Sequence, residues 1–274
     1  MLTCLKEIFR DHSEYAIAGF NVFGYEDAAP VLKAAEELNE PVALMVNRVA
    51  QAHMPLPVFA PMLLELARRA SVPVSVHLDH AVDQQIIEEA LKAGFTSVMF
   101  DGSCLPVEEN IRRTKQVVEM ARACGASVEA EIGAVAYSGP DAEKNTVYTT
   151  PDAARLFFES TRVDCLAVSV GTVHRMTTQT AHIQYDRLCE IHRAVDVPLV
   201  IHGSTGLPNE DLARLSHCGV SKINIGTCLR MAFGRSMREY MAEHPNEFDR
   251  ITIFQYPMEK VYEAAREKLL AIRK

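Results

Sequence analysis

Three histidines of this sequence each follow an apolar run that is rich in β-branched residues. His80 follows the run 74–78, His174 follows 166–173, and His202 follows 199–201. Such runs are typical of strands buried in a parallel sheet. Because the runs are far apart in the sequence, the histidines can meet only if their strands share one end of one sheet. Three imidazoles gathered there would form the ligand set of a catalytic zinc, with a fourth position open to water or substrate.

Carboxylates accompany these histidines. Asp79 directly precedes His80 and could act as a general acid or base beside a bound cation, or hold a histidine in place. Glu129 and Glu131 are two residues apart in one strand-like run, so they face the same side of it, and Glu131, nearer the end, is expected to face the metal. Asp101 follows another apolar run and is a second candidate to hold a metal-binding histidine.

Other residues are less suited to bind the metal. His77 lies one strand repeat before Asp79, so we expect it to point into the interior as a structural group. The seven cysteines contain no Cys-x-x-Cys pair, which disfavours a cysteine metal site, and their odd number favours free thiols in a reducing cytoplasm; they are Cys4, Cys104, Cys124, Cys165, Cys189, Cys218 and Cys228.

Two glycine- and hydroxyl-rich segments predict a phosphate site. Residues 202–206 read His-Gly-Ser-Thr-Gly, and residues 224–227 read Asn-Ile-Gly-Thr before a helical pattern. Backbone amides of such loops, and of a helix N-terminus, bind phosphate. A phosphate at one end and an oxygen-rich carbon centre at the metal together indicate a phosphorylated sugar as substrate.

Strand-like and helix-like segments alternate along the whole chain. Short apolar runs predict eight buried parallel strands at 16–22, 41–47, 73–79, 97–103, 127–133, 165–171, 198–204 and 222–227. Apolar residues spaced by three and four predict helices at 26–38, 58–70, 84–93, 107–124, 151–160, 185–194, 209–218 and 229–242, and a further amphipathic helix at 257–274. Eight such alternations predict an α/β fold, a (β/α)₈ TIM barrel in a single domain over 1–274 with an extra C-terminal helix; a doubly wound open sheet is the alternative.

Composition excludes several classes of partner. The net charge is −8, and the basic residues are scattered, which argues against nucleic-acid and anionic-membrane partners. Charges interrupt the first eleven residues, and no stretch approaches eighteen uncharged apolar residues, so we expect a cytoplasmic protein without an export signal or a membrane span.

Five motifs, in the same order along the chain, resemble class II (zinc-dependent) fructose- and tagatose-bisphosphate aldolases. They are His-Leu-Asp-His at 77–80, Glu-Ala-Glu-Ile-Gly at 129–133, Gly-Thr-Val-His at 171–174, His-Gly-Ser-Thr-Gly at 202–206 and Lys-Ile-Asn-Ile-Gly-Thr at 222–227. The resemblance extends from Phe20 to the carboxyl terminus.

This resemblance implies a reaction and a set of roles. The ketose phosphate would be cleaved between C3 and C4 into dihydroxyacetone phosphate and an aldehyde, with zinc polarising the ketone and stabilising the enediolate. The implied zinc ligands are His80, His174 and His202; Asp79 would move the C4 hydroxyl proton, Asn224 would hold substrate oxygens, and Glu131 would lie close to the metal. The phosphate- and substrate-binding residues would be Asn21, Gly171, Gly203, Ser204, Thr205, Gly226 and Thr227. The family also implies a homodimer or homotetramer and a monovalent cation, Na⁺ or K⁺, near the phosphate.

The sequence departs from the family pattern at several places. The loop after the fifth predicted strand lacks the family's Gly-Gly-x-Glu, so Glu143 is the candidate for moving the proton at the dihydroxyacetone phosphate carbon, with Asp141 and Tyr137 as alternatives. Three arginines are candidates for substrate specificity: Arg48 and Arg175 stand where the family has other residues, and Arg250 roughly matches an arginine that reaches a neighbouring subunit's site.

Three functions remain compatible with these residues. The first is a zinc-dependent aldolase, a lyase of carbohydrate metabolism. The second is a metal-dependent epimerase or lyase that does not cleave carbon–carbon bonds, and the third is a phosphosugar-binding protein, which the altered loop would favour. Imidazole ligands also accept cobalt, iron or manganese.

Overall fold

The strands of the protein close into a barrel. A computed structural model describes residues 1–137, 146–175 and 181–274. Each strand pairs in parallel with its sequence neighbour, and the eighth pairs with the first. The strands are β1 (Ile17–Asn21), β2 (Val42–Val46), β3 (Val74–Ala81), β4 (Ser97–Phe100), β5 (Ser127–Ile132), β6 (Cys165–Val168), β7 (Leu199–Ile201) and β8 (Val220–Ile225). The (β/α)₈ prediction is confirmed, and closure of the sheet excludes the doubly wound alternative.

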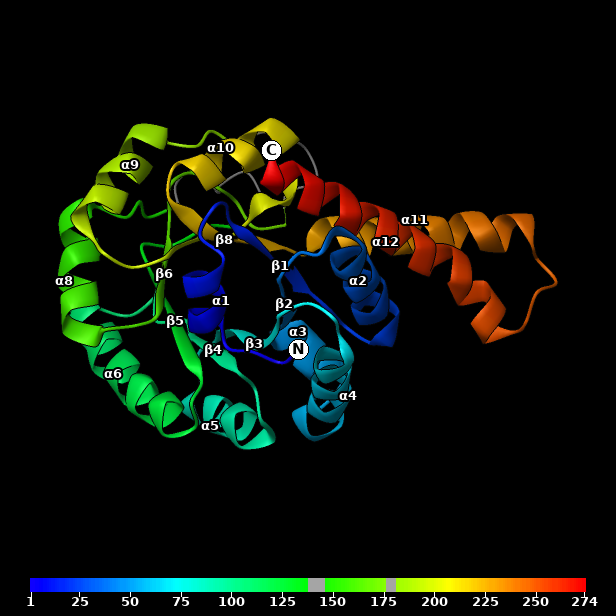
Figure 1. The fold of residues 1–274 in the computed structure, drawn as a ribbon, viewed down its shortest axis with the longest axis horizontal. Helices are drawn as coiled ribbons and strands as arrows, with labels where there is room; N and C mark the ends of the chain where they lie inside the picture. The colour runs from blue at the N-terminus through cyan, green and yellow to red at the C-terminus, as the bar shows by residue number, and fades with distance from the viewer. Residues whose placement is uncertain (138–145, 176–180) are drawn as a thin grey trace.

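Helices surround this barrel (Figure 1). They are α1 (Leu5–Asp11), α2 (Tyr25–Leu38), α3 (Arg48–His53), α4 (Leu56–Arg69), α5 (Gln84–Ala93), α6 (Val107–Ala123), α8 (Pro151–Thr161), α9 (Tyr185–Ala194), α10 (Asn209–His217), α11 (Thr227–Glu243) and α12 (Arg250–Arg273), with a 3₁₀ turn η1 at Ser204–Gly206. The helices predicted between the strands all form, while α1 and α3 were not predicted. None of the helices in the described ranges combines the length and apolar character that a membrane crossing requires.

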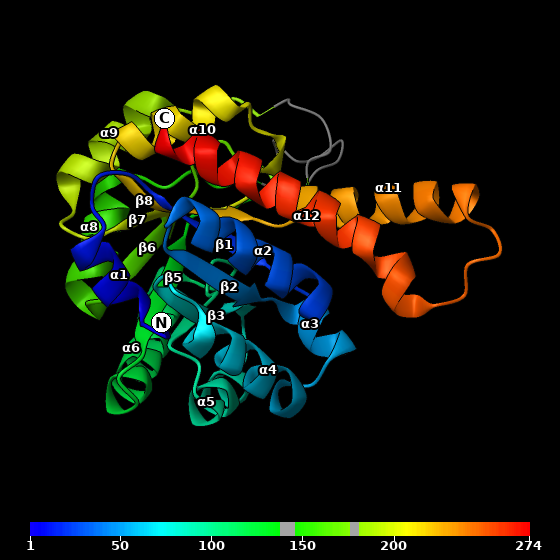
Figure 2. The same ribbon diagram turned by 45° about the vertical axis from the view of Figure 1, so that its right-hand side comes forward.

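The C-terminal helix is longer than predicted. It begins at Arg250, because the Asp249 side chain accepts a hydrogen bond from the Ile251 amide and caps the first turn. Pro257, the predicted start, lies inside the helix instead, where it cannot donate a backbone hydrogen bond. Together α11 and α12 form a long pair that extends away from the barrel (Figure 2).

Alternation along the strands separates two apolar regions. Residues such as Phe20, Leu44 and Leu78 face outward and pack against the surrounding helices. Inward residues form a second cluster with one face of α1, which lies across the amino-terminal mouth of the barrel (Figure 1). Its members are Leu5, Ile8, Phe9, Ile17, Ala43, Met45, Cys165, Ala167 and Val200. This end of the barrel is therefore closed by apolar packing, and any site must lie at the other end.

Candidate active site

A bulge in β3 brings Asp79 and His80 into the same site. In a regular strand, consecutive side chains point to opposite faces. Here the pairing of β3 with β4 shifts register between Leu78 and Ala81, and His80 has a φ of +52°. Both Asp79 and His80 consequently line one cavity at the carboxyl-terminal end of the strands. Left-handed backbone is uncommon outside glycine, so the surrounding structure holds His80 in this conformation.

The three predicted histidines converge at this end. Ring centroids lie 5.0 Å apart for His80 and His174, 4.6 Å for His80 and His202, and 6.0 Å for His174 and His202. One nitrogen from each lies within 4.8 Å of the others, a spacing that could hold a metal ion. His80, Asp101 and Glu131 form an overlapping group of the same kind, whereas His77 belongs to neither group among the described residues.

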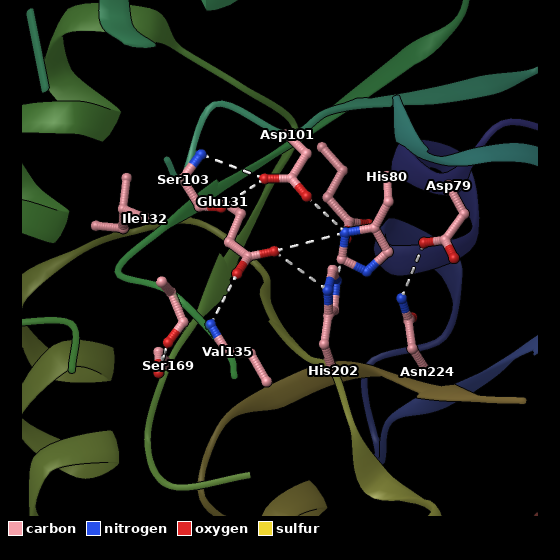
Figure 3. A network of polar contacts seen from close by, with 12 residues as sticks. Asp79, His80, Asp101, Ser103, Glu131, Ile132, Val135, Ser169, His202 and Asn224 are labelled. Carbon is pink, nitrogen blue, oxygen red and sulfur yellow. Dashed lines mark hydrogen bonds and ion pairs between the residues drawn. The ribbon is translucent and has the colours of Figure 1, made fainter. Parts of the chain in front are cut away.

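Carboxylates decide which ring nitrogen of two histidines faces the centre. The His80 Nδ1 lies 2.8 Å from Asp101 Oδ2, which leaves Nε2 available. The His202 Nε2 lies 2.8 Å from Glu129 Oε1, which leaves Nδ1 available. Figure 3 shows Asp101 and Glu131 on one side of these histidines and the Asp79–Asn224 pair on the other. His80 therefore presents Nε2 to the centre, whereas His202 presents Nδ1. The spacing of the histidines in the sequence does not predict this difference.

Two buried polar atoms at the centre lack a hydrogen bond. Within the described chain, neither His202 Nδ1 nor Glu131 Oε2 has a partner with hydrogen-bond geometry, although the two lie 3.4 Å apart. Buried polar atoms are costly when unsatisfied. An imidazole nitrogen and a carboxylate oxygen beside two further histidines are the donors that a divalent cation such as zinc prefers, so the residues fit a bound metal.

Charges at the site shift several pKa values. Burial by itself lowers the pKa of His202, but Glu129 and Glu131 raise it to about 10, so without a metal a second proton on Nδ1 occupies the position from which a bound cation would displace it. Burial lowers the pKa of His174 to about 3, helped by the other two histidines, so this imidazole is neutral and able to bind a cation. Burial opposes ionisation of Asp79 and Asp101, yet the adjacent histidines hold the pKa of both carboxyls below the usual range. Both aspartates are therefore ionised near neutral pH.

Two asparagines hold the Asp79 carboxylate. The Asn21 Nδ2 donates to Oδ2 at 2.8 Å, and the Asn224 Nδ2 donates to Oδ1 at 3.4 Å. Asp79 is only 2 % exposed, yet it lines the cavity. The structure thus presents an ionised, oriented carboxylate beside the histidines.

The predicted phosphate residues meet at one wall of the cavity. Gly203, Ser204 and Thr205 from the loop after β7, and Gly226 and Thr227 from the start of α11, all line it. The Ser204 hydroxyl donates to the Asn224 carbonyl at 2.5 Å and so joins the two loops. Gly171 is not among the lining residues that are described; its φ is +111°, and a Cβ there would lie 2.2 Å from the His182 carbonyl oxygen.

The specificity candidates are placed differently from one another. Arg48 lines the cavity from the first residue of α3, and Arg175 lines it next to His174. Arg250 lies on the outer part of the α11–α12 pair, 3.4 Å from Glu26, and takes no part in the cavity of its own chain. Glu143 and Asp141 lie outside the described residues, whereas Tyr137 stands over the His174 ring, with centroids 5.2 Å apart.

Sequence reasoning missed two cations near this site. Arg230 lines the cavity from the first turn of α11, over the Phe23 ring, and its spacing of three residues from Thr227 was the available signal. Lys222 is completely buried below the histidines. Its signal was a single charge in an apolar strand, two residues before Asn224 and hence on the same face.

The comparisons with known proteins agree with this geometry. The family model "Fructose-bisphosphate aldolase class-II" matches residues 4–274. A sulfofructosephosphate aldolase of Alkalicoccus urumqiensis is 33% identical over 270 residues, covering 97% of this chain and 93% of the relative. The structure of the YdjI aldolase from Escherichia coli K12 superposes with a TM-score of 0.86 at 32% identity, covering 99% of this chain and 97% of the other.

A further solved structure, described provisionally as a fructose-1,6-bisphosphate aldolase from Coccidioides immitis, has a TM-score of 0.85 at 29% identity over 98% of this chain and 94% of that one. These named relatives are all aldolases, and none is called an epimerase or a binding protein. The chain belongs to the class II fructose-bisphosphate aldolase family and is a ketose-phosphate aldolase, a lyase that acts on a phosphorylated sugar.

Proposed function

We propose that this enzyme uses a bound zinc ion to cleave a phosphorylated ketose into dihydroxyacetone phosphate and an aldehyde that itself carries an anionic group. The observation that carries the proposal is the convergence of His80, His174 and His202 beside the loops after β7 and β8. Membership of a family whose members depend on zinc supports the metal.

The proposed metal site follows from the available nitrogens. His80 through Nε2, His202 through Nδ1 and His174 would hold the ion, with Asp101 and Glu129 keeping the rings in place. Glu131, whose Oε2 lies 3.4 Å from His202 Nδ1, would lie beside the ion. When bound, a zinc ion in this position supplies a Lewis acid that polarises a carbonyl oxygen.

Phosphate would bind at the wall formed by the loops after β7 and β8. The start of α11 has no side-chain cap, so its backbone amides at Gly226 and Thr227 can donate hydrogen bonds to a phosphate oxygen, and the helix dipole favours the negative charge. Gly203 and Thr205 face the same space. A monovalent cation beside this phosphate belongs to the proposal as well.

Proton transfer would involve the oriented carboxylate. Asp79 is ionised and held by Asn21 and Asn224, so it can accept the C4 hydroxyl proton as the C3–C4 bond breaks and return it in the reverse direction. Asn224 would also hold substrate oxygens. Glu143 remains the predicted residue for the proton at the dihydroxyacetone phosphate carbon.

A cation is available for the far end of the substrate. In the closed barrel β8 and β1 separate β7 from β2, so Arg48 reaches the cavity three strands away from the loop after β7. Arg175 adds a second positive charge at the rim. The name of the Alkalicoccus relative, a sulfofructosephosphate aldolase, describes a sugar that carries a sulfo group as well as a phosphate, and both groups are anionic. We therefore propose a substrate with a second anionic group, either a sulfonate or a phosphate.

Oligomerisation is part of the same proposal. The side chain of Arg250 is 76 % exposed on the extended α11–α12 pair. In a homodimer or homotetramer it would add a positive charge to the cavity of a neighbouring subunit.

The test is release of dihydroxyacetone phosphate from a panel of ketose 1-phosphates, ketose 1,6-bisphosphates and a 6-sulfonated ketose 1-phosphate. Each substrate is assayed with the enzyme as purified, after chelation, and after chelation followed by zinc. We expect chelation to lower cleavage at least about 10³-fold, because several kcal/mol of charge stabilisation is lost, and zinc to restore it. Cleavage that survives complete metal removal would contradict the proposal.

A further inference from the structure

A layer of buried polar side chains lies inside the barrel, between the metal-site histidines and the apolar cluster that closes the amino-terminal mouth. Lys222, Glu129 and His77 are each 0 % exposed, and none of them is among the described residues that line the cavity. Burying an ammonium costs several kcal/mol unless it is well paired. A buried lysine at position 222 therefore indicates a role that an apolar side chain could not fill.

Lys222 makes three short contacts. Its Nζ lies 2.8 Å from Glu129 Oε2, 2.7 Å from Asn224 Oδ1 and 3.8 Å from Met45 Sδ. An ammonium has three donors, so these contacts use all of them. With no exposed atom, Lys222 cannot reach a substrate and acts only through its neighbours.

One neighbour leads to the metal side of the site. The second oxygen of Glu129, Oε1, lies 2.8 Å from His202 Nε2. A neutral imidazole has one N–H, so a carboxylate at Nε2 keeps the proton there and leaves the Nδ1 lone pair for a cation. The Lys222 contact fixes the rotation of the Glu129 carboxylate, because its two oxygens then have different partners.

The other neighbour leads to the acid–base side. Since Asn224 Oδ1 accepts from Lys222, its Nδ2 must turn toward Asp79 Oδ1, as the Asp79–Asn224 pair in Figure 3 shows. A flipped amide would place an NH₂ against the ammonium and a carbonyl oxygen against a carboxylate. A single cation thus sets the orientation of groups on both sides of the cavity.

We propose that Lys222 is a positioning residue that, through Glu129, fixes the proton of His202 on Nε2 and, through Asn224, orients the amide that holds Asp79. This inference rests on the proposed zinc-dependent aldolase function.

The first measurement needs no variant. Long-range ¹H–¹⁵N spectra of the zinc-loaded enzyme report which nitrogen of each metal-bound histidine carries the proton. We expect one ligand with its proton on Nε2, which is His202, and one with its proton on Nδ1, which is His80. If every metal-bound histidine carries its proton on Nδ1, the proposal is overturned.

Variants then test Lys222 itself. Lys222→Met is expected to weaken zinc binding about 10- to 100-fold, measured by competition with a chromophoric chelator. At saturating zinc we expect kcat to fall at least about 10-fold with KM changed less than about 3-fold, since Lys222 does not touch substrate. Met99→Leu is the matched control, because Met99 is a buried, neutral residue opposite Glu129 in the β4–β5 register, and it should change none of these values more than about 2-fold.

A double variant separates positioning from stability. Lys222→Met combined with Glu129→Gln removes both charges and leaves no ion unpaired, so it should fold even where the single variant does not. We expect its zinc affinity and kcat to stay low although its unfolding free energy recovers. Recovery of zinc affinity and kcat together with stability would show a merely structural role and overturn the proposal, as would wild-type values in Lys222→Met. Absence of zinc binding or cleavage by the wild-type enzyme would instead contradict the proposed function.

Discussion

The two ends of the barrel use the same eight strands for opposite purposes. At the amino-terminal end, Leu5, Ile8 and Phe9 of α1 pack against inward apolar residues of the strands. At the carboxyl-terminal end, the inward positions hold histidines, carboxylates and asparagines around a cavity. Along β3, the inward series runs from the neutral hydroxyl of Ser75 through His77 to the ionised carboxylate of Asp79.

This difference separates stability from chemistry in space. Apolar burial at the plugged end contributes roughly 25 cal/mol for each Å² removed from water and needs no precise orientation. Charged groups at the open end are costly unless paired, so each one there must be oriented by a partner. We therefore expect substitutions at the open end to affect catalysis or a specific backbone conformation, and equivalent substitutions at the other end to affect mainly stability.

The largest expected effect is that of Asp79→Asn. An amide cannot accept the substrate proton, so kcat at saturating zinc should fall about 10²- to 10⁴-fold. The Asn21 and Asn224 donors lose a charged acceptor, which should change the unfolding free energy by no more than about 2 kcal/mol.

The control for this variant lies on the same strand toward the plug. Ser75 is buried, and its hydroxyl lies 3.1 Å from Thr96 Oγ1. Ser75→Ala should cost about 1 kcal/mol of stability while kcat stays within about 2-fold of wild type. If both variants lower kcat equally, the assignment of chemistry to one end of the barrel is wrong.

Two glycines with positive φ allow the backbone to be compared at the two ends of the barrel. Gly171, after β6, would place an alanine Cβ 2.2 Å from the His182 carbonyl oxygen, whereas a Cβ at Gly125, before β5, meets nothing within 4 Å. Gly125→Ala should cost only the backbone term of about 1 kcal/mol. Gly171→Ala adds a steric clash and should cost at least about 3 kcal/mol. Urea unfolding measures both, and equal costs would mean that the loop after β6 adjusts freely.

Substitution of Arg48 tests the positive charge that this residue adds to the cavity wall. Arg48→Met should lower kcat/KM for a ketose bisphosphate or sulfonated ketose phosphate about 10- to 100-fold, as expected for loss of one charge-assisted hydrogen bond. A ketose 1-phosphate without a second anionic group should be affected less than about 3-fold. Arg68→Met, an exposed arginine of α4, serves as the control. Equal losses of kcat/KM for both substrates would show that Arg48 does not determine specificity.

The smallest expected effect concerns Asp27, a buried residue whose carboxylate accepts a hydrogen bond from the amide of Phe23, which lines the cavity. Burial raises its pKa from 3.8 to about 6, although the Phe23 amide donates to it. Because the pKa is higher in the folded protein than in the unfolded chain, this group stabilises the fold below about pH 4 and loses that contribution as pH rises through about 6. The full shift corresponds to about 3 kcal/mol at about 1.4 kcal/mol per unit.

Asp27→Asn removes the buried charge, which should raise the free energy of unfolding at pH 8 by about 3 kcal/mol. The new amide oxygen is a weaker acceptor for the Phe23 amide, which should lower that free energy by about 2 kcal/mol. The variant should therefore be about 1 kcal/mol more stable than wild type at pH 8 and no more stable at pH 4. Urea unfolding at both pH values measures this difference. A variant that is less stable at both would show that the carboxylate is tightly paired in the fold.

The sequence predicted much of this fold because its signals are local. Continuous apolar runs marked the eight strands, and a three–four spacing marked the helices between them. The helix α1 was not predicted, because its seven residues are too few to show a clear helical period. Its role also depends on the mouth of the barrel that it closes. Capping by Asp249 rather than the position of Pro257 decided where α12 begins.

For the site, residue types could be predicted but not their partners. His80, His174 and His202 stood out because histidines after apolar runs are conspicuous, and Asp79 adjoined one of them. The bulge that brings Asp79 and His80 together could not be predicted, because it arises from pairing with β4. Arg230 and Lys222 were missed for a similar reason, since a single charge in a pattern does not say what it faces.

The sequence by itself determined the eight strands, the helices predicted between them, and the polar residues at one end of the strands. It could do so because burial imposes a periodic pattern of apolar residues on each helix and strand. Only the tertiary structure decided that the sheet closes, that Glu129 meets Nε2 of His202 while Asp101 meets Nδ1 of His80, and that Lys222 joins Glu129 to Asn224. The Asp101–His80, Glu129–His202 and Lys222–Glu129 contacts join residues that are 21, 73 and 93 positions apart. Such pairings depend on strand order and register, which local patterns do not contain.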